Sequence, residues 1–241
     1  MLSFNNDPKL KELLLEEIIA HRKADLLYQG AYKKLVDGKE KFCAVGCAIH
    51  TLNIKLGKTY DEGDHQVYET ELGIPRQLAY LEDRFFEKKE KEQAMVWPER
   101  FINAIPVGVD LSMVVPKFMW WLMGDIKQFI KNNQRVLDVI TTVENLYRRK
   151  VQGEIIKDEE WFDARAAAYA VYAAYAAAAY AYAVYADAAY VDAVYAVVYA
   201  VDAAAAAYAA AAYADAAYAA KKMQIEKMAD KLIEIIQETK S

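Results

Sequence analysis

The sequence predicts a mainly α-helical protein, and three observations support this fold class. Apolar residues recur at intervals of three and four along much of residues 1–150. The second half of the chain is rich in alanine, which is the strongest helix former and a weak strand former. From Glu154 onward the sequence contains neither glycine nor proline, the residues that most often interrupt helices.

Residues 1–150 have a mixed composition and are predicted to form an N-terminal helical domain. Its first helix is expected over residues 10–27, with Asp7 as the N-cap and Pro8 in the first turn. A polar loop is expected over residues 55–64, and strand signals are weak throughout. Further helices are expected over residues 42–56, 77–89, 97–105, 113–123 and 126–147.

The second half of the chain is of low complexity, because every residue from Ala166 to Ala220 is Ala, Tyr, Val or Asp. We expect residues 151–220 to form an Ala/Tyr/Asp-rich helical array, followed by an amphipathic helix over residues 221–241. Tyrosine recurs every fifth residue from Tyr175 to Tyr195. This spacing leaves a β-solenoid with a five-residue repeat as an alternative for residues 170–220, although alanine at most other positions favours helix.

Charge and cysteine content exclude several classes of protein. The net charge of −5 and the pI of about 5.4 argue against a protein that binds the nucleic-acid backbone. Two cysteines only four residues apart, without a secretory signal, indicate the reducing cytoplasm of the host cell. Residues 166–186 carry no charge, but they contain no Leu, Ile or Phe, so we expect no membrane span.

The most specific candidate site is the segment that contains Cys43, Cys47 and His50. On a helix these positions lie at i, i+4 and i+7 and share one face. With His65 from the following loop, they supply the four ligands of a tetrahedral zinc site. Two alternatives remain open: buried structural cysteines, and a reactive Cys43 whose pKa is lowered by the helix N-terminus and by His65.

A second candidate is an aromatic binding site formed by Trp97, Arg100, Trp120 and Trp121. Such residues could line a ligand pocket, but aromatic clusters in a helical domain more often belong to the hydrophobic core.

The chain also carries a set of motifs with a recognisable pattern. They are the CAVGC-x2-H motif from Cys43 to His50, the WPERF segment at 97–101, the AIPVG segment at 104–108, and the alanine-rich C-terminal tract. In these motifs the sequence resembles a group of phage and bacterial proteins of unassigned activity. The tract differs in using Tyr and Asp where those proteins often use Trp and Arg. The resemblance implies an origin in a mobile genetic element.

From these features we expect a phage- or prophage-type accessory protein that is not an enzyme and acts by binding a host protein or a small ligand. The helical array would provide a scaffold for a protein partner or for self-association, with no nucleic acid or membrane involved. One alternative is a thiol- or metal-dependent hydrolase that uses Cys43 with His50 or His65. Another is a structural or assembly protein.

Overall fold

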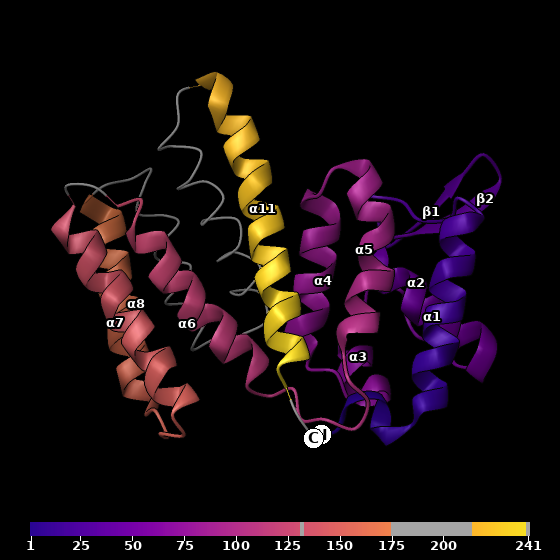
Figure 1. The fold of residues 1–241 in the computed structure, drawn as a ribbon, viewed down its shortest axis with the longest axis horizontal. Helices are drawn as coiled ribbons and strands as arrows, with labels where there is room; N and C mark the ends of the chain where they lie inside the picture. Colours follow the sequence, from indigo (N-terminus) through magenta and orange to yellow (C-terminus); the bar gives the residue numbers. More distant parts are fainter. Residues whose placement is uncertain (131–132, 175–213, 240–241) are drawn as a thin grey trace. The chain divides into compact units, whose positions relative to one another are not determined.

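The computed structural model describes residues 1–130, 133–174 and 214–239, and these residues are mainly helical (Figure 1). The chain divides into two compact units. The first unit comprises Met1–Ser112 and Ile233–Ser241, and the second comprises Met113–Leu232. The tyrosine repeat, and with it most of the region for which a β-solenoid was the alternative, lies outside the described residues. The expected self-association through the array lies outside them too.

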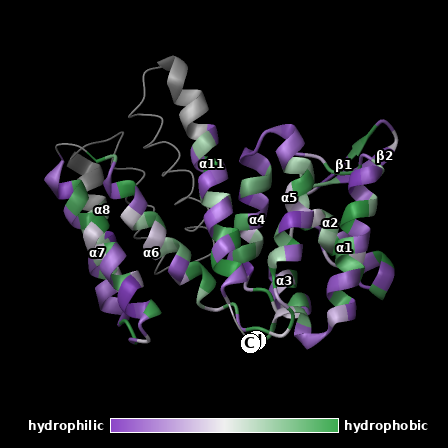
Figure 2. Ribbon diagram, in the orientation of Figure 1, coloured by the Kyte–Doolittle hydropathy of each residue, from purple (hydrophilic) through white to green (hydrophobic). Residues whose placement is uncertain are grey.

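The first unit is built from helices, one left-handed turn and one β-hairpin. In chain order these are η1 (Ser3–Asn6), α1 (Pro8–Lys23), β1 (Lys33–Val36), β2 (Lys39–Phe42), α2 (Ala44–Leu56), α3 (Gln66–Leu72), α4 (Arg76–Lys88) and α5 (Lys91–Ala104). Helix α5 lies between α1 and α4 and contacts both of them (Figure 1). The green apolar stretches of these helices alternate with purple polar ones, as amphipathic helices around a common core require (Figure 2).

Helix α1 begins where the sequence predicts it to begin. The side chain of Asp7 accepts a hydrogen bond from the backbone N–H of Lys9, and Pro8 occupies the first helical position. Leu14 and Ile18 are one helical turn apart and fully buried. The helix ends at Lys23, a few residues earlier than expected, because Asp25 adopts a positive φ of 57° and turns the chain toward the hairpin.

The β-hairpin was not predicted from the sequence, and neither were the short helix α3 and the turn η1. Strands β1 and β2 pair antiparallel, with Lys33 opposite Phe42 and Val36 opposite Lys39. Asp37 and Gly38 form the two-residue loop, with φ values of 51° and 75°. Positive φ at both positions is the geometry of a type I′ turn, which favours the Asp-Gly sequence.

Helix α2 starts at Ala44 and packs closely against the segment that precedes the hairpin. A Cβ atom on Gly46 would lie 2.2 Å from the carbonyl oxygen of Tyr32, so only glycine allows this approach. The same carbonyl accepts a hydrogen bond from the N–H of Cys43. This close contact places the start of α2 next to the loop before β1.

Helix α5 begins at Lys91, so the helix predicted to open at Trp97 starts six residues earlier in the chain. The residues added are good helix formers, and Ala94 and Trp97 face the core. Pro98 lies within the helix and is buried.

The N-terminal segment is fixed to the loop that follows α5. The hydroxyl of buried Ser3 donates to the carbonyl of Pro106 at 2.5 Å and accepts from the N–H of Val109 at 3.0 Å. Backbone hydrogen bonds from Ser3 to Val109 and from Gly108 to Ser3 complete the connection. Phe4, fully buried, follows in the left-handed region with φ of 52°.

The second unit contains α6 (Val114–Lys127), α7 (Gln134–Val151), α8 (Asp158–Ala174) and the larger part of α11 (Ala214–Gln237). Helix α7 packs against both α6 and α8. It starts at Gln134, where Asn133 accepts a hydrogen bond from Val136 N–H, so the helix predicted from residue 126 is interrupted before that point.

The boundary between the units does not coincide with the change in composition at residue 150. Residues 113–150 belong to the second unit because α7 packs against α6. A compact unit is defined by such contacts, and the composition of the sequence does not reveal them. The ends of the alanine-rich tract that the structure describes, residues 166–174 and 214–220, are helical as predicted. No helix within the described residues is both long enough and apolar enough to cross a membrane.

Candidate functional site

The first unit contains a cleft with a volume of about 880 Å³, which we call the charged cleft. Three segments line it: the loop entering β1, the loop before α3 and one face of α4. The lining residues are Gly30, Ala31, Tyr32, Lys33, Asp61, Glu62, Gly63, Asp83, Arg84, Glu87 and Lys88. Most of them are charged, so the cleft suits a polar ligand more than an apolar one.

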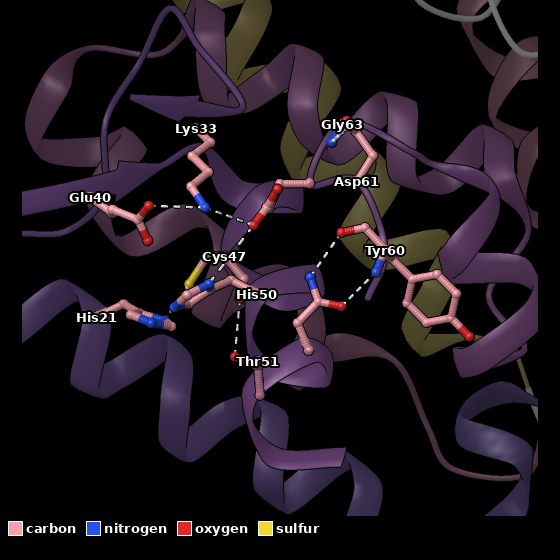
Figure 3. Close-up of polar contacts among 11 residues, drawn as sticks. His21, Lys33, Glu40, Cys47, His50, Thr51, Tyr60, Asp61 and Gly63 are labelled. Carbon is pink, nitrogen blue, oxygen red and sulfur yellow. Dashed lines mark hydrogen bonds and ion pairs between the residues drawn. The ribbon is translucent and has the colours of Figure 1, made fainter. Parts of the chain in front are cut away.

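Lys33 connects the hairpin to the loop before α3. Its ammonium group lies 3.0 Å from a carboxylate oxygen of Glu40 and 3.3 Å from one of Glu62 (Figure 3). Glu62 also lies 4.0 Å from Nδ1 of His50. Lys33 is therefore held by carboxylates on two sides, and hydrogen bonding to Glu40 raises its pKa.

Two further carboxylates of the charged cleft are bound to backbone N–H groups. Asp61 accepts a hydrogen bond from Gly63 N–H at 2.8 Å, which shapes the turn before α3. Glu87 accepts one from the backbone of Gly30. Burial raises the pKa of Glu87, and the hydrogen bond from Gly30 offsets part of this effect.

His65 is buried next to Asp83, which is one of the residues that line the charged cleft. Nε2 of His65 lies 3.8 Å from a carboxylate oxygen of Asp83, too far for a hydrogen bond. The His65 side chain is only 1% exposed, and its ring stacks on Tyr80 with centroids 3.8 Å apart. Neither Nε2 of His65 nor Oδ1 of Asp83 has a hydrogen-bond partner.

Cys43 lies at the N-terminus of α2 but outside the helix itself. It is the N-cap residue, with φ −71° and ψ −176°, and its sulfur accepts a hydrogen bond from Gly46 N–H at 3.3 Å. The predicted lowering of its pKa is wrong. Burial raises the pKa of the Cys43 thiol well above its ordinary value, and the neighbouring Asp83 carboxylate raises it further. The hydrogen bond from Gly46 acts in the opposite direction and is outweighed.

Cys47 lies one turn further along α2 and contacts a histidine that the sequence reading did not consider. Its sulfur lies 2.7 Å from Nδ1 of His21 on α1 (Figure 3). The Cys47 side chain is fully buried, and burial raises its pKa well above the ordinary value. His50 stacks on Phe42, with ring centroids 4.1 Å apart, and burial lowers its pKa.

The four residues proposed as zinc ligands therefore do not converge on one point, because each contacts a different neighbour. Cys43 adjoins Asp83, Cys47 adjoins His21, and His50 and His65 stack on different aromatic rings. Across residues 1–130, 133–174 and 214–239, no group of three or more His, Cys, Asp or Glu side chains is arranged to hold a metal ion. Cys43 would share a helix face with Cys47 and His50 only if it were part of the helix. It is instead the N-cap residue that precedes the helix.

The aromatic candidates are divided between the two units. Trp97 is fully buried in the first unit, where its indole N–H donates to the backbone carbonyl of Glu82 at 2.9 Å. The guanidinium of Arg100 lies 6.0 Å from the centroid of the Trp97 ring. Trp120 and Trp121 are half-buried residues of α6 in the second unit. Trp97 is thus a core residue of the first unit.

Asp83 and Glu87 are the functional candidates that the sequence did not reveal. Both lie on the mostly polar face of α4 and look like ordinary exposed acids in the sequence. Their role depends on the loops that α4 contacts in the folded protein, and no local sequence motif predicts such a contact. The glycines Gly30 and Gly63 were the available signal, because they mark the loops that line the cleft.

No protein-family model, curated protein or solved structure matches this chain. Functional inference therefore rests on the geometry of the site.

Proposed function

We propose that the protein acts by binding, and that its ligand is a small polar molecule held in the charged cleft. The observation that carries this proposal is the charged lining of the cleft, because seven of its eleven lining residues carry a charge. Such a surface complements the hydrogen-bonding groups of a polar ligand better than it complements an apolar one.

The size and the lining of the charged cleft support the same proposal. Its volume of about 880 Å³ is within the range common for small-molecule sites. The lining comes from three segments distant in sequence, which a packed helical scaffold holds in place. An accessory protein from a mobile element, as the resemblance of the CAVGC-x2-H motif implies, acts in this view by sequestering a small ligand.

Binding is favoured over hydrolysis because of what surrounds the thiol of Cys43. In a thiol hydrolase the nucleophile contacts an imidazole, which a third group orients from behind. Here the group next to the thiol is the carboxylate of Asp83, which favours the protonated thiol and not the thiolate.

The proposal is tested by filling the charged cleft. Ala31 lines the cleft, so Ala31→Trp blocks it, while Ala20→Trp adds the same side chain at an exposed position of α1. A panel of polar metabolites is screened by thermal shift, and hits are confirmed by calorimetry. We expect at least one compound to raise the Tm of the wild type and of Ala20→Trp, but not that of Ala31→Trp.

Two results would contradict the proposal. One is a panel of small polar compounds from which none stabilises the wild type. The other is binding that Ala31→Trp leaves intact, which would place the ligand elsewhere on the protein.

A further inference from the structure

The charged cleft contains one exposed aromatic side chain, that of Tyr32. Of the described residues that line the cleft, Tyr32 alone has an aromatic ring, and the residue is 43% exposed. A single exposed aromatic residue on a protein surface is ordinary and needs no explanation. The question is therefore whether the fold holds this particular ring in place while leaving it open to the cleft.

The main chain of Tyr32 is fixed on both sides. Its carbonyl oxygen accepts a hydrogen bond from the N–H of Cys43 at 3.3 Å. The same oxygen lies so close to Gly46 that a Cβ atom on that residue would be 2.2 Å away. The next residue, Lys33, is already paired with Phe42 in the hairpin. The backbone that carries the ring is thus held by α2 and by the β-sheet.

The ring of Tyr32 is fixed as well, because it lies against the backbone of Gly63. A Cβ atom on Gly63 would be 2.8 Å from Cδ2 and 3.3 Å from Cε2 of the ring. Gly63 is not among the glycines with a positive φ, so the space for the ring, and not the backbone conformation, requires glycine here. The buried ring of His65 meets the Tyr32 ring edge-on, with centroids 5.4 Å apart, and itself stacks on Tyr80.

An aromatic ring that is held in this way offers a preformed surface for stacking. Little conformational entropy remains to be lost when a ligand covers it, and a flat ring is the group that stacks on it best. Such stacking tolerates different bases, because every base has a π-face.

The groups around the ring indicate what kind of flat ring fits. Lys33 follows Tyr32 in the chain, and Asp61 and Glu62 precede Gly63, so charged groups of both signs flank the stacking surface. A hydrocarbon ring would remove water from these groups without replacing its hydrogen bonds. A nucleobase carries both donors and acceptors on its edges and can replace them.

We infer that the charged cleft binds a small molecule with a nucleobase-like ring, a flat heterocycle with polar edges, and that this ring stacks on Tyr32. This inference rests on the proposed function, because it specifies the chemical class of the ligand for the same cleft. Tyr32 is then the residue that selects ligands with a flat ring from other polar molecules.

The inference is tested with nucleosides and with the sugar that they share. Adenosine, inosine, cytidine and uridine carry the ring, and ribose lacks it. Binding of each to the full chain is measured by calorimetry under identical conditions. We expect at least one nucleoside to bind about tenfold more tightly than ribose, or better, which is within the range measured for stacking of one base on an aromatic side chain.

Variants assign this difference to the ring of Tyr32. Tyr32→Phe keeps the ring and should bind that nucleoside as the wild type does, whereas Tyr32→Leu removes the flat surface and should lose about tenfold in affinity. Tyr28→Leu makes the same change in the same loop but outside the cleft lining, and it should bind like the wild type. The comparison between nucleosides and ribose on the wild type does not depend on any variant being folded.

The outcomes separate this inference from the proposed function. The inference is overturned if no nucleoside binds more tightly than ribose, or if Tyr32→Leu binds the nucleoside as the wild type does. It is also overturned if Tyr32→Phe or Tyr28→Leu loses as much affinity as Tyr32→Leu. The proposed function survives these results if another polar compound stabilises the wild type but not Ala31→Trp. If the nucleoside binds equally to Ala31→Trp, both the inference and the site are wrong.

Discussion

Gly46 lies against the carbonyl oxygen of Tyr32 so closely that a Cβ on this residue would be 2.2 Å from that oxygen. The contact is between two stretches of backbone, and rotation of a side chain cannot relieve it. Tyr32 is part of the charged cleft, and the same carbonyl accepts the N–H of Cys43. The glycine of the CAVGC motif thus sets the distance between α2 and the loop that lines the cleft.

Gly46→Ala is expected to destabilise the first unit by about 3 kcal/mol, the upper part of the range for overpacking. Helix propensity alone predicts the opposite sign, since alanine exceeds glycine by about 1 kcal/mol within a helix. Gly124→Ala is the control, because Gly124 is also helical and its nearest neighbour is the flexible end of Glu144. Urea denaturation of both variants measures the difference, and a stabilised Gly46→Ala would refute the contact.

The thiols of Cys43 and Cys47 are expected to resist alkylation in the native protein. Both are buried, and burial raises both pKa values, so the reactive thiolate is scarce at neutral pH. Modification by N-ethylmaleimide at pH 7.5, followed by mass spectrometry, should proceed only at the rate of unfolding. Asn103→Cys places a thiol at an exposed position of α5 as an internal standard. Rapid native labelling of Cys43 would instead support the hydrolase alternative.

Glu82 is expected to make the stability of the protein depend on pH. The residue is fully buried, and desolvation raises its pKa to about 8, an effect that its interaction with the Tyr68 hydroxyl offsets only in part. The unfolded chain releases this proton near the ordinary value of 4.5 while the folded protein retains it. The contribution of Glu82 to stability is therefore full below pH 4.5, falls as the pH rises toward 8, and is constant above that.

Urea denaturation at pH 5 and pH 8 measures this effect. We expect the wild type to lose a few kcal/mol between these values relative to Glu82→Gln, which cannot ionise. Parallel pH profiles for the two proteins would show that Glu82 is ionised in the fold or has a partner for its charge.

Ser3→Ala is expected to lower the free energy of unfolding by about 2 kcal/mol. The change removes one hydroxyl and leaves two backbone groups, the part-buried carbonyl of Pro106 and the buried N–H of Val109, without that partner. Ser112→Ala removes an exposed hydroxyl that bonds only to Asp110 and should cost less than about 0.5 kcal/mol. Equal stability of the two variants would mean that the N-terminal segment does not hold the loop after α5.

Local signals in the sequence account for the longer helices, but the short helix α3 and the hairpin were not predicted. The Asp7-Pro8 cap and the spacing of Leu14 and Ile18 predict α1, because a helix is determined by neighbours within one turn. The hairpin was missed because its strands are short, exposed and rich in lysine, so they show no apolar alternation. Its only signal was the Asp37-Gly38 turn.

The candidate site was predictable only in the part that forms a compact motif. The CAVGC-x2-H segment drew attention to Cys43, and the structure places it beside Asp83 in the same buried region. Asp83 itself gave no signal, because its importance arises where α4 meets His65 and Gly63 from another segment. Contacts of this kind depend on tertiary packing, which no periodicity in a single sequence encodes.

The first unit is completed by isoleucines from the far end of α11. Ile233, Ile235 and Ile236 are buried and belong with Met1–Ser112, while Met113–Leu232 separate them in the chain. At translation rates of about 5–20 residues per second, the ribosome takes on the order of ten seconds to make the intervening segment. A nascent chain therefore carries residues 1–112 without this last segment of the unit throughout that interval, and the unit is complete only after residues 233–236 have been made.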